Sequence, residues 1–381
     1  MNILKLKIAH CGDLHIGAKI LGIGDEKSRI LENEVKEAFF GVLDVCKEEK
    51  VDVLLIAGDF FDDTSVNSSD VREIISRMGK YAYKIFISPG NHDPFTADSP
   101  YVKFEWPKNV YIFKSRKAEK VLIEEKSAVI WGSAFENRYE WDSMMKGVKA
   151  DDEKMLNICL MHGELNSADE SRYNPISLSD IKSSGMDYVA LGHIHKRAEI
   201  EKLASTNYAY SGNLQGTGFD ELGEKGFYIG TISKEICDLK FRRACKRRFE
   251  VVHIDVSDCT FLDDFVNKTL QHLMEKYGES YDKNLYKVVF EGSIPESASF
   301  DAALIASKLH ERVFYAQIID NTQPKIDIEK LKFKTDFKSL FIKKMIKKIE
   351  ESTSEREKEM NEKALKIGLK AFEGDVKYIE N

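Results

Sequence analysis

The stretch YVALGHIHK, residues 188–196, joins a short apolar run to two histidines separated by one residue. The run is partly β-branched or aromatic and a glycine ends it, so it predicts a buried strand that opens into a loop. His193 and His195 then lie where the strand meets the loop. From this stretch alone, two interpretations stay open: polar residues at a strand end, or a metal site.

Four further apolar runs end in turns that carry ligand-type side chains. In chain order these are Asp13 and His15 in CGDLH, Asp59 and Asp62 in GDFFDD, Asn91 and His92 in PGNHD, and His162 in MHGE. Ligands gather where the strands of open α/β sheets end, so five turns can converge on one patch. One such turn alone has an ordinary explanation, whereas five together favour a functional site.

The candidate ligands are oxygen atoms and imidazoles, without a thiolate. This set suits manganese, iron or magnesium better than a structural zinc, which remains an alternative. More than six candidate ligands are too many for one ion. A carboxylate shared by two ions about 3.5–4 Å apart is a usual solution in enzymes that cut phosphate esters.

Composition limits the class of protein. With 381 residues, 43% of them hydrophobic, the chain predicts two or three domains. The net charge of −7 argues against a uniformly positive surface for nucleic acid, but leaves local patches open. Six scattered cysteines without a CxxC pair predict reduced core residues. Without a signal peptide or a run of about 18 apolar residues, we expect a soluble cytoplasmic protein with no membrane segment.

The order of patterns predicts an α/β fold. Helical patterns at 29–50 and 69–82 alternate with apolar strands, which indicates βαβ units around a buried sheet. Residues 110–232 read mainly as strands that could complete a two-sheet sandwich with helices outside. The predicted domains are an α/β domain that carries the five turns at 1–245, a small α+β domain at 246–325 and a C-terminal helical segment at 326–381.

A basic stretch, KFRRACKRRF, covers residues 240–249. It could present a basic edge to DNA phosphates. The alternative is a solvated basic strand bonded to acidic neighbours. The DNA-binding candidates are Arg242, Arg243, Lys246, Arg247 and Arg248.

The C-terminal segment shows an apolar face at helical spacing, followed by a second helical pattern at 355–372. Its partner-binding candidates are Phe337, Leu340, Phe341, Met345 and Ile349. Two short helices either fold back on their own domain or dock on a partner. The chain has no GxxxxGK[ST] loop of the kind that binds nucleotide phosphates.

In their order, the five turns resemble the calcineurin-like metallophosphoesterase superfamily, whose pattern is DxH, GDxxD, GNHD, a later H and GHxH. Within it, YSGNLQGTGFDELGEKGF at 210–227 resembles the segment after the last motif in SbcD-type DNA repair exonucleases. The bacterial YhaO type is a related alternative. The resemblance implies a four-layer β-sandwich flanked by helices, with a small α+β capping domain.

The resemblance also implies roles for individual residues. Asp13, His15 and His195 would bind one metal ion, Asn91, His162 and His193 the other, and Asp59 would bridge them. His92 would act as general acid or stabilise the leaving oxygen, with Asp62 holding its imidazole. Archaeal and eukaryotic relatives have histidine in place of Asp62, so this chain is similar to the bacterial type.

The resemblance implies a manganese-dependent two-metal DNA phosphodiesterase, with magnesium or iron as alternatives. It would act as a 3′–5′ exonuclease and single-strand endonuclease in double-strand-break repair with an SbcC-type ABC ATPase. A homodimer through helices at 68–83 and 97–104 is implied as well. The alternatives are a small-molecule phosphodiesterase or phosphatase of the same superfamily, and a non-catalytic scaffold.

Overall fold

The structure is a computed structural model that describes residues 4–64, 66–152, 154–166, 171–295, 297–325 and 336–372. The chain divides into two compact units. The first comprises Met1–Val251 with Lys283–Tyr286, and the second Val252–Asp282 with Lys287–Asn381. The three domains predicted from the sequence stay a prediction.

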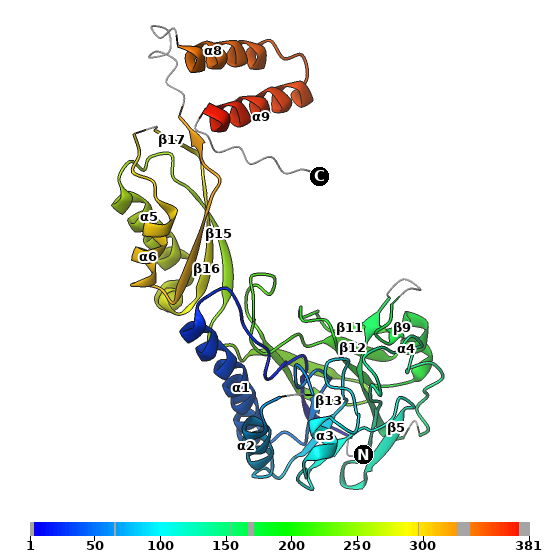
Figure 1. Cartoon of the computed structure of the whole chain (residues 1–381). Helices are drawn as coiled ribbons and strands as arrows, with labels where there is room; N and C mark the ends of the chain where they lie inside the picture. The colour runs from blue at the N-terminus through cyan, green and yellow to red at the C-terminus, as the bar shows by residue number, and fades with distance from the viewer. Residues whose placement is uncertain are drawn as a thin grey trace. The chain divides into compact units, whose positions relative to one another are not determined.

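The first unit contains two six-stranded sheets (Figure 1). The first sheet has the order β14 (Cys237–Arg243), β13 (Gly226–Ile232), β1 (Leu6–Cys11), β2 (Val53–Ile56), β3 (Lys84–Ile87) and β4 (Val110–Ile112). Strands β1 to β4 are parallel, whereas β13 pairs antiparallel with both β1 and β14. The carboxyl ends of β1, β2 and β3 therefore meet at one edge.

The second sheet also has four parallel strands, which here lie at its centre. Its order is β11 (Glu201–Leu203), β12 (Thr206–Tyr210), β10 (Tyr188–Gly192), β7 (Leu156–His162), β6 (Ala128–Gly132) and β5 (Glu119–Ile123). Strands β12, β10, β7 and β6 are parallel, with antiparallel β11 and β5 at the edges. A short parallel pair, β8 (Glu164–Leu165) and β9 (Pro175–Ile176), follows β7.

Alternate residues of each strand enter different cores, as the pleat requires. On β2, Val53 and Leu55 pack between the two sheets, whereas Leu54 and Ile56 pack beneath the helices. The opposite face of the second sheet has its own core, which includes Met161 of β7. The first unit thus has four layers, helix, sheet, sheet and helix, and the predicted α/β sandwich flanked by helices is confirmed.

Helices α1 (Asp25–Glu48), α2 (Ser68–Met78) and α3 (Pro100–Lys103) belong to the first core, and α4 (Leu178–Ser184) to the outer face of the second sheet. Along α1, Leu31, Val35, Phe39 and Val42 recur at three- and four-residue spacing and are buried. Helix α4 begins with a capping box at Ser177. A single 3₁₀ turn, η1 (Glu124–Lys126), follows β5.

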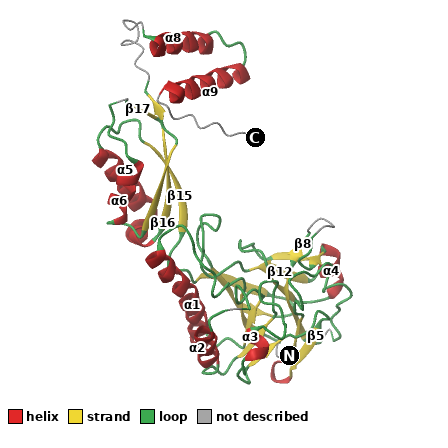
Figure 2. Cartoon of the chain, viewed as in Figure 1, coloured by secondary structure: helices red, strands yellow, loops and turns green. Residues whose placement is uncertain are grey.

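The second unit contains most of a three-stranded sheet, with helices (Figure 2), although the first residues of two of its strands are assigned to the first unit. The sheet has the order β15 (Phe249–Asp255), β16 (Leu285–Glu291) and β18 (Tyr315–Asp320), and α5 (Leu262–Tyr277) and α6 (Ala302–His310) connect its strands. The 3₁₀ helix η2 (Gly278–Lys283) follows α5, and β17 (Ser293–Ile294) pairs with β19 (Gln323–Pro324). This confirms the predicted small α+β arrangement.

Two antiparallel helices, α8 (Phe337–Glu350) and α9 (Glu355–Phe372), form a hairpin near the C-terminus. All six cysteines are free thiols. Within the described residues, no helix combines the length and the apolar character needed to cross a membrane.

Candidate metal centre

The ligand-type side chains of the five motifs lie together where the parallel strands end. Asp13 and His15 follow β1, Asp59 follows β2, Asn91 follows β3, His162 ends β7, and His193 and His195 follow β10. Two sheets that share one direction of their central strands therefore deliver seven candidate ligands to one place. The five turns converge, as the sequence predicts.

The first metal position is defined here by Asp13, His15 and His195, whose ligand atoms all lie within 4.8 Å of one another. The two Nε2 atoms of His15 and His195 are 3.0 Å apart. Oδ1 of Asp13 accepts a hydrogen bond from the backbone N–H of His193. Oδ2 of Asp13 is buried and has no hydrogen-bond partner, which is expected of an oxygen atom that serves as a metal ligand.

The second metal position is defined by Asn91, His162 and His193. Oδ1 of Asn91 lies 2.9 Å from Nε2 of His162 and 3.2 Å from Nδ1 of His193. Burial and the neighbouring His162 lower the pKa of His193 to about 3. The His193 ring is therefore neutral and can act as a ligand.

Asp59 lies between the two positions. Its Oδ2 is 3.2 Å from Nε2 of His162 and 3.7 Å from Nε2 of His15. Burial alone would raise the pKa of Asp59, but the neighbouring histidines lower it well below its usual value. One ionised oxygen atom that faces a histidine of each position has the geometry of a bridging ligand.

Hydrogen bonds on the far side of the rings determine which nitrogen atoms face the centre. Nδ1 of His162 donates to the carbonyl oxygen of Ala57 at 3.0 Å, and Nδ1 of His15 lies 3.0 Å from Oδ1 of Asp62. In both rings the Nε2 atom is then left to bind a metal ion. Converging carboxylate, amide and imidazole lone pairs fit divalent cations, so the residues present suit a two-metal centre.

His92 lies beside this centre, with its ring 4.7 Å from that of His15. Its Nδ1 is 3.0 Å from the carbonyl oxygen of Asp62 and 3.4 Å from the Asp62 carboxylate. The hydrogen bond with Asp62 raises the pKa of His92 to about 9. The backbone of Asp62 thus lies closer to the ring than the carboxylate, whose Oδ1 is nearer to His15.

Two glycines explain how the strand ends approach so closely. A Cβ on Gly58, whose φ is +83°, would lie 2.2 Å from Nδ1 of His162. A Cβ on Gly192 would lie 1.6 Å from the carbonyl oxygen of Ala57. The glycine before Asp59 and the one before His193 are therefore required by the contact between the two sheets.

Glu221 and Tyr173 contact the centre but do not appear among the residues predicted from the motifs. Oε1 of Glu221 accepts a hydrogen bond from Nδ1 of His195. The Tyr173 ring lies 5.0 Å from the His193 ring at an interplanar angle of 34°. The only feature of the sequence that could have indicated a role for Glu221 is its position in the stretch at 210–227, which carries the family resemblance. Tyr173 has no such feature.

The basic stretch predicted for DNA binding is largely occupied by ion pairs within the first unit. Arg242 lies 3.2 Å from Glu49, Lys246 pairs with Glu37, Arg247 is 3.0 Å from Glu34, and Arg243 and Arg248 are 3.9 Å and 3.6 Å from Glu224. The arrangement is that of the alternative interpretation, a basic strand bonded to acidic neighbours. The structure brings none of these five side chains to the metal positions.

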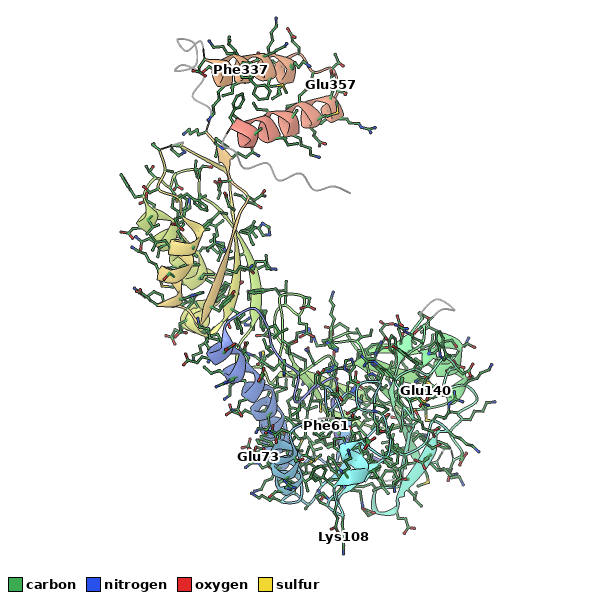
Figure 3. All side chains as sticks on the ribbon, viewed as in Figure 1. Phe61, Glu73, Lys108, Glu140, Phe337 and Glu357 are labelled. Carbon is green, nitrogen blue, oxygen red and sulfur yellow. The ribbon has the colours of Figure 1, made fainter. Side chains whose placement is uncertain are left out.

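The five partner-binding candidates of α8 divide into two groups. Phe341, Met345 and Ile349 pack against the hairpin core around Ile342 of α8. Phe337, labelled in Figure 3, is 78% exposed, and Leu340 is 53% exposed. The last two are the most exposed of the five, and the Phe337 ring also contacts that of Phe372 on α9, at 5.8 Å.

Metal binding is expected to strengthen as the pH rises towards about 9. Burial lowers the pKa of His162, but the Asp59 carboxylate outweighs burial and raises that pKa to about 9. A proton therefore occupies the metal-free ring at neutral pH, and a metal ion must displace it. Mn²⁺ affinity should rise about tenfold per pH unit below pH 9 and then level off. Titration calorimetry at several pH values measures this, and a flat profile would contradict it.

Comparison with known proteins gives a consistent set of matches. The model of the calcineurin-like phosphoesterase family matches residues 6–197. The uncharacterized metallophosphoesterase YhaO of Bacillus subtilis is 28% identical over 305 residues, which cover 76% of this chain and 73% of YhaO. The DNA double-strand break repair protein Mre11 of Methanocaldococcus jannaschii is 23% identical over 290 residues (69% and 73%), and that of Aeropyrum pernix 23% over 320 residues (76% and 74%). All seven candidate ligands lie within residues 6–197.

Proposed function

This chain belongs to the calcineurin-like phosphoesterase family, and from that premise we propose that it is a two-metal phosphodiester hydrolase that cuts DNA. The family supports a metal-dependent hydrolase, and the clustered histidines and aspartates could hold the metal ions. Oxygen and imidazole ligands without thiolate favour Mn²⁺, with Mg²⁺ or Fe²⁺ as alternatives. The proposed activities are 3′–5′ exonuclease and single-strand endonuclease.

The metal ions and His92 would have different roles in the proposed hydrolysis. When bound, two divalent cations supply Lewis-acid stabilisation of a phosphate oxygen and lower the pKa of a water towards neutrality. The His92 side chain is 33% exposed, and its Nδ1 is held by Asp62, so Nε2 is the nitrogen available to substrate. With its pKa raised to about 9, His92 is protonated at neutral pH and can give a proton to the leaving oxygen.

An aromatic surface beside the metal positions carries the proposal that the substrate is a nucleic acid. The Tyr139 ring lies 5.9 Å from that of Tyr173, which in turn packs on His193. The Arg172 guanidinium lies 4.4 Å above the Tyr139 ring, and Tyr139 is 38% exposed. Aromatic rings with an adjacent arginine stack nucleobases independently of sequence. Phosphate hydrolysis alone needs no such surface.

The relatives support the same substrate class. Two of them are DNA double-strand break repair proteins, at 23% identity. YhaO, the relative of 28% identity, carries no substrate in its name. The aromatic surface and the two Mre11 relatives together support DNA end processing as the role of this chain.

The function is tested with two substrates and two metals. We expect Mn²⁺-dependent shortening of end-labelled duplex and single-stranded DNA that EDTA abolishes. Tyr139→Ala should lower kcat/KM for single-stranded DNA about tenfold relative to a chromogenic phosphodiester, and Tyr139→Phe should preserve the ratio. Hydrolysis of the small ester with DNA untouched would instead support a small-molecule phosphodiesterase.

That second candidate has one observation in its favour. Because Arg242, Arg247 and Lys246 already pair with glutamates of the first unit, they offer duplex DNA fewer open cationic contacts than the sequence indicates. Binding of DNA through these residues therefore stays a prediction that requires exchange of the glutamate pairs for phosphates.

We also propose that the C-terminal hairpin binds an SbcC-type ABC ATPase. Removing residues 330–381 should abolish co-purification of this partner while preserving hydrolysis of the chromogenic ester, because no candidate ligand lies there. Phe337→Asp with Leu340→Asp should act like the deletion, since both side chains are exposed on α8. Unchanged co-purification of the truncated chain would refute the proposal.

A homodimer through α2 and α3 completes the proposed assembly. Val102 on α3 is 48% exposed, which leaves an apolar side chain at that surface. Light scattering would decide between this dimer and a monomer of 43.6 kDa.

A further inference from the structure

Glu221 lies in the loop between β12 and β13 and contacts a candidate metal ligand directly. Its side chain is 8% exposed, and its Oε1 accepts a hydrogen bond from Nδ1 of His195. Its Oε2 accepts hydrogen bonds from the backbone N–H of Thr217 at 2.7 Å and from the Thr217 hydroxyl at 2.9 Å. The carboxylate is therefore fixed on its far side by its own loop.

The same loop also holds the backbone of His195. Nζ of Lys225, which is 7% exposed, donates to the carbonyl oxygen of His195 at 3.1 Å. The backbone N–H of Asn213 donates to the same oxygen at 3.3 Å. A Cβ on Gly212 would lie 2.8 Å from it. The loop that carries Glu221 thus holds both the ring and the backbone of His195, so the side chain is fixed in one orientation.

We propose that Glu221 is a positioning residue that sets the metal affinity of the first metal position. The inference rests on the two-metal centre proposed above. Because Nδ1 of His195 donates to Glu221, Nε2 is the ring nitrogen left as ligand, and it faces Nε2 of His15 at 3.0 Å. A carboxylate behind a ligating histidine fixes the tautomer and raises the basicity of the ring.

Among the residues that the structure describes, Glu221 makes no hydrogen bond with a histidine of the second metal position, so its effect on the two positions can be separated. Nδ1 of His162 donates to an uncharged backbone carbonyl, that of Ala57, at 3.0 Å. The hydrogen bonds of the Glu221 side chain that the structure describes are with His195 and Thr217. Loss of Glu221 should therefore weaken metal binding at the first position and leave the second unchanged.

The experiment measures Mn²⁺ binding to the full chain by equilibrium dialysis, without substrate. Wild type should bind two ions. Glu221→Ala should weaken one of them about 10–100-fold, and Glu221→Gln, which keeps an acceptor without the charge, should fall between. Glu224→Ala is the matched control, because this acid of the same loop pairs with Arg243 and Arg248 instead. It should bind both ions as wild type does.

Activity provides the second readout. The Mn²⁺ concentration for half-maximal ester hydrolysis should rise by the same factor in Glu221→Ala, with kcat restored at excess Mn²⁺. If Glu221→Ala fails to fold in a metal-free melting curve, Glu221→Gln decides the question. Unchanged affinity in the folded variants, equal weakening of both ions, or a wild type that binds no Mn²⁺ would each overturn the proposal. Two bound ions with uncut DNA would refute the proposed substrate only.

Discussion

His92→Ala is expected to lower kcat for phosphodiester hydrolysis by about 10²–10⁴-fold while both metal ions stay bound. A positioned general acid contributes a factor of this size. The contact of His92 with the bridging carboxylate is made by its backbone, whose N–H donates to Oδ1 of Asp59 at 2.9 Å. Alanine keeps that hydrogen bond, so the bridging carboxylate keeps its orientation.

Single-turnover kinetics and Mn²⁺ stoichiometry, measured on the same preparation, test this expectation. His253→Ala is a suitable control, because His253 is an exposed histidine paired with Glu291 in the second unit. It should leave kcat unchanged. Loss of a metal ion in His92→Ala would show that the residue is a ligand, and retained turnover would remove its catalytic role.

Asp59→Asn should have the second large effect, on both metal ions at once. Its Oδ2 faces His15 of the first position and His162 of the second. The substitution keeps the size of the side chain but removes the charge and can turn an amide donor towards these nitrogens. Both Mn²⁺ affinities should fall by more than about 100-fold, the upper end of the cost of losing an outer-shell partner.

Equilibrium dialysis and ester hydrolysis check this result together. Asp63→Asn, an exposed aspartate of the same turn, is the control and should bind both ions. If Asp59→Asn lost only one ion, Asp59 would be a terminal ligand rather than a bridge. The rate of ester hydrolysis by Asp59→Asn should fall at least in proportion to the loss of bound Mn²⁺.

The sequence predicted the place of the metal centre because strand ends are a local feature. An apolar run followed by glycine and a polar residue marks the carboxyl end of a strand, and parallel strands share that edge. The pattern of the sequence alone therefore groups Asp13, Asp59 and His162. Their individual roles as ligands or bridge are implied by the family resemblance and not by the pattern of strand ends.

What the sequence could not predict depends on partners distant in the chain. The glutamates that pair with Lys246 and Arg247 of the basic stretch lie on α1, about 200 residues earlier. Similarly, Tyr139 and Tyr173 come from two loops that a β-bridge between Glu140, labelled in Figure 3, and Tyr173 joins. Neither loop has a periodic pattern. An apolar helical face, as on α8, also does not reveal whether its own neighbour or another protein covers it.

The backbone at the metal ligands has a further consequence. Asp13, His15, Asp59 and His193 all have positive φ values, of 52°, 48°, 44° and 103°. Such conformations cost non-glycine residues on the order of 1 kcal/mol or more each, so the fold carries strain at the residues that would do its chemistry. A glycine at one of these positions would relax the backbone while removing a ligand. Selection for a more stable chain and selection for an active one would therefore favour different residues here, which is a trade-off between stability and activity.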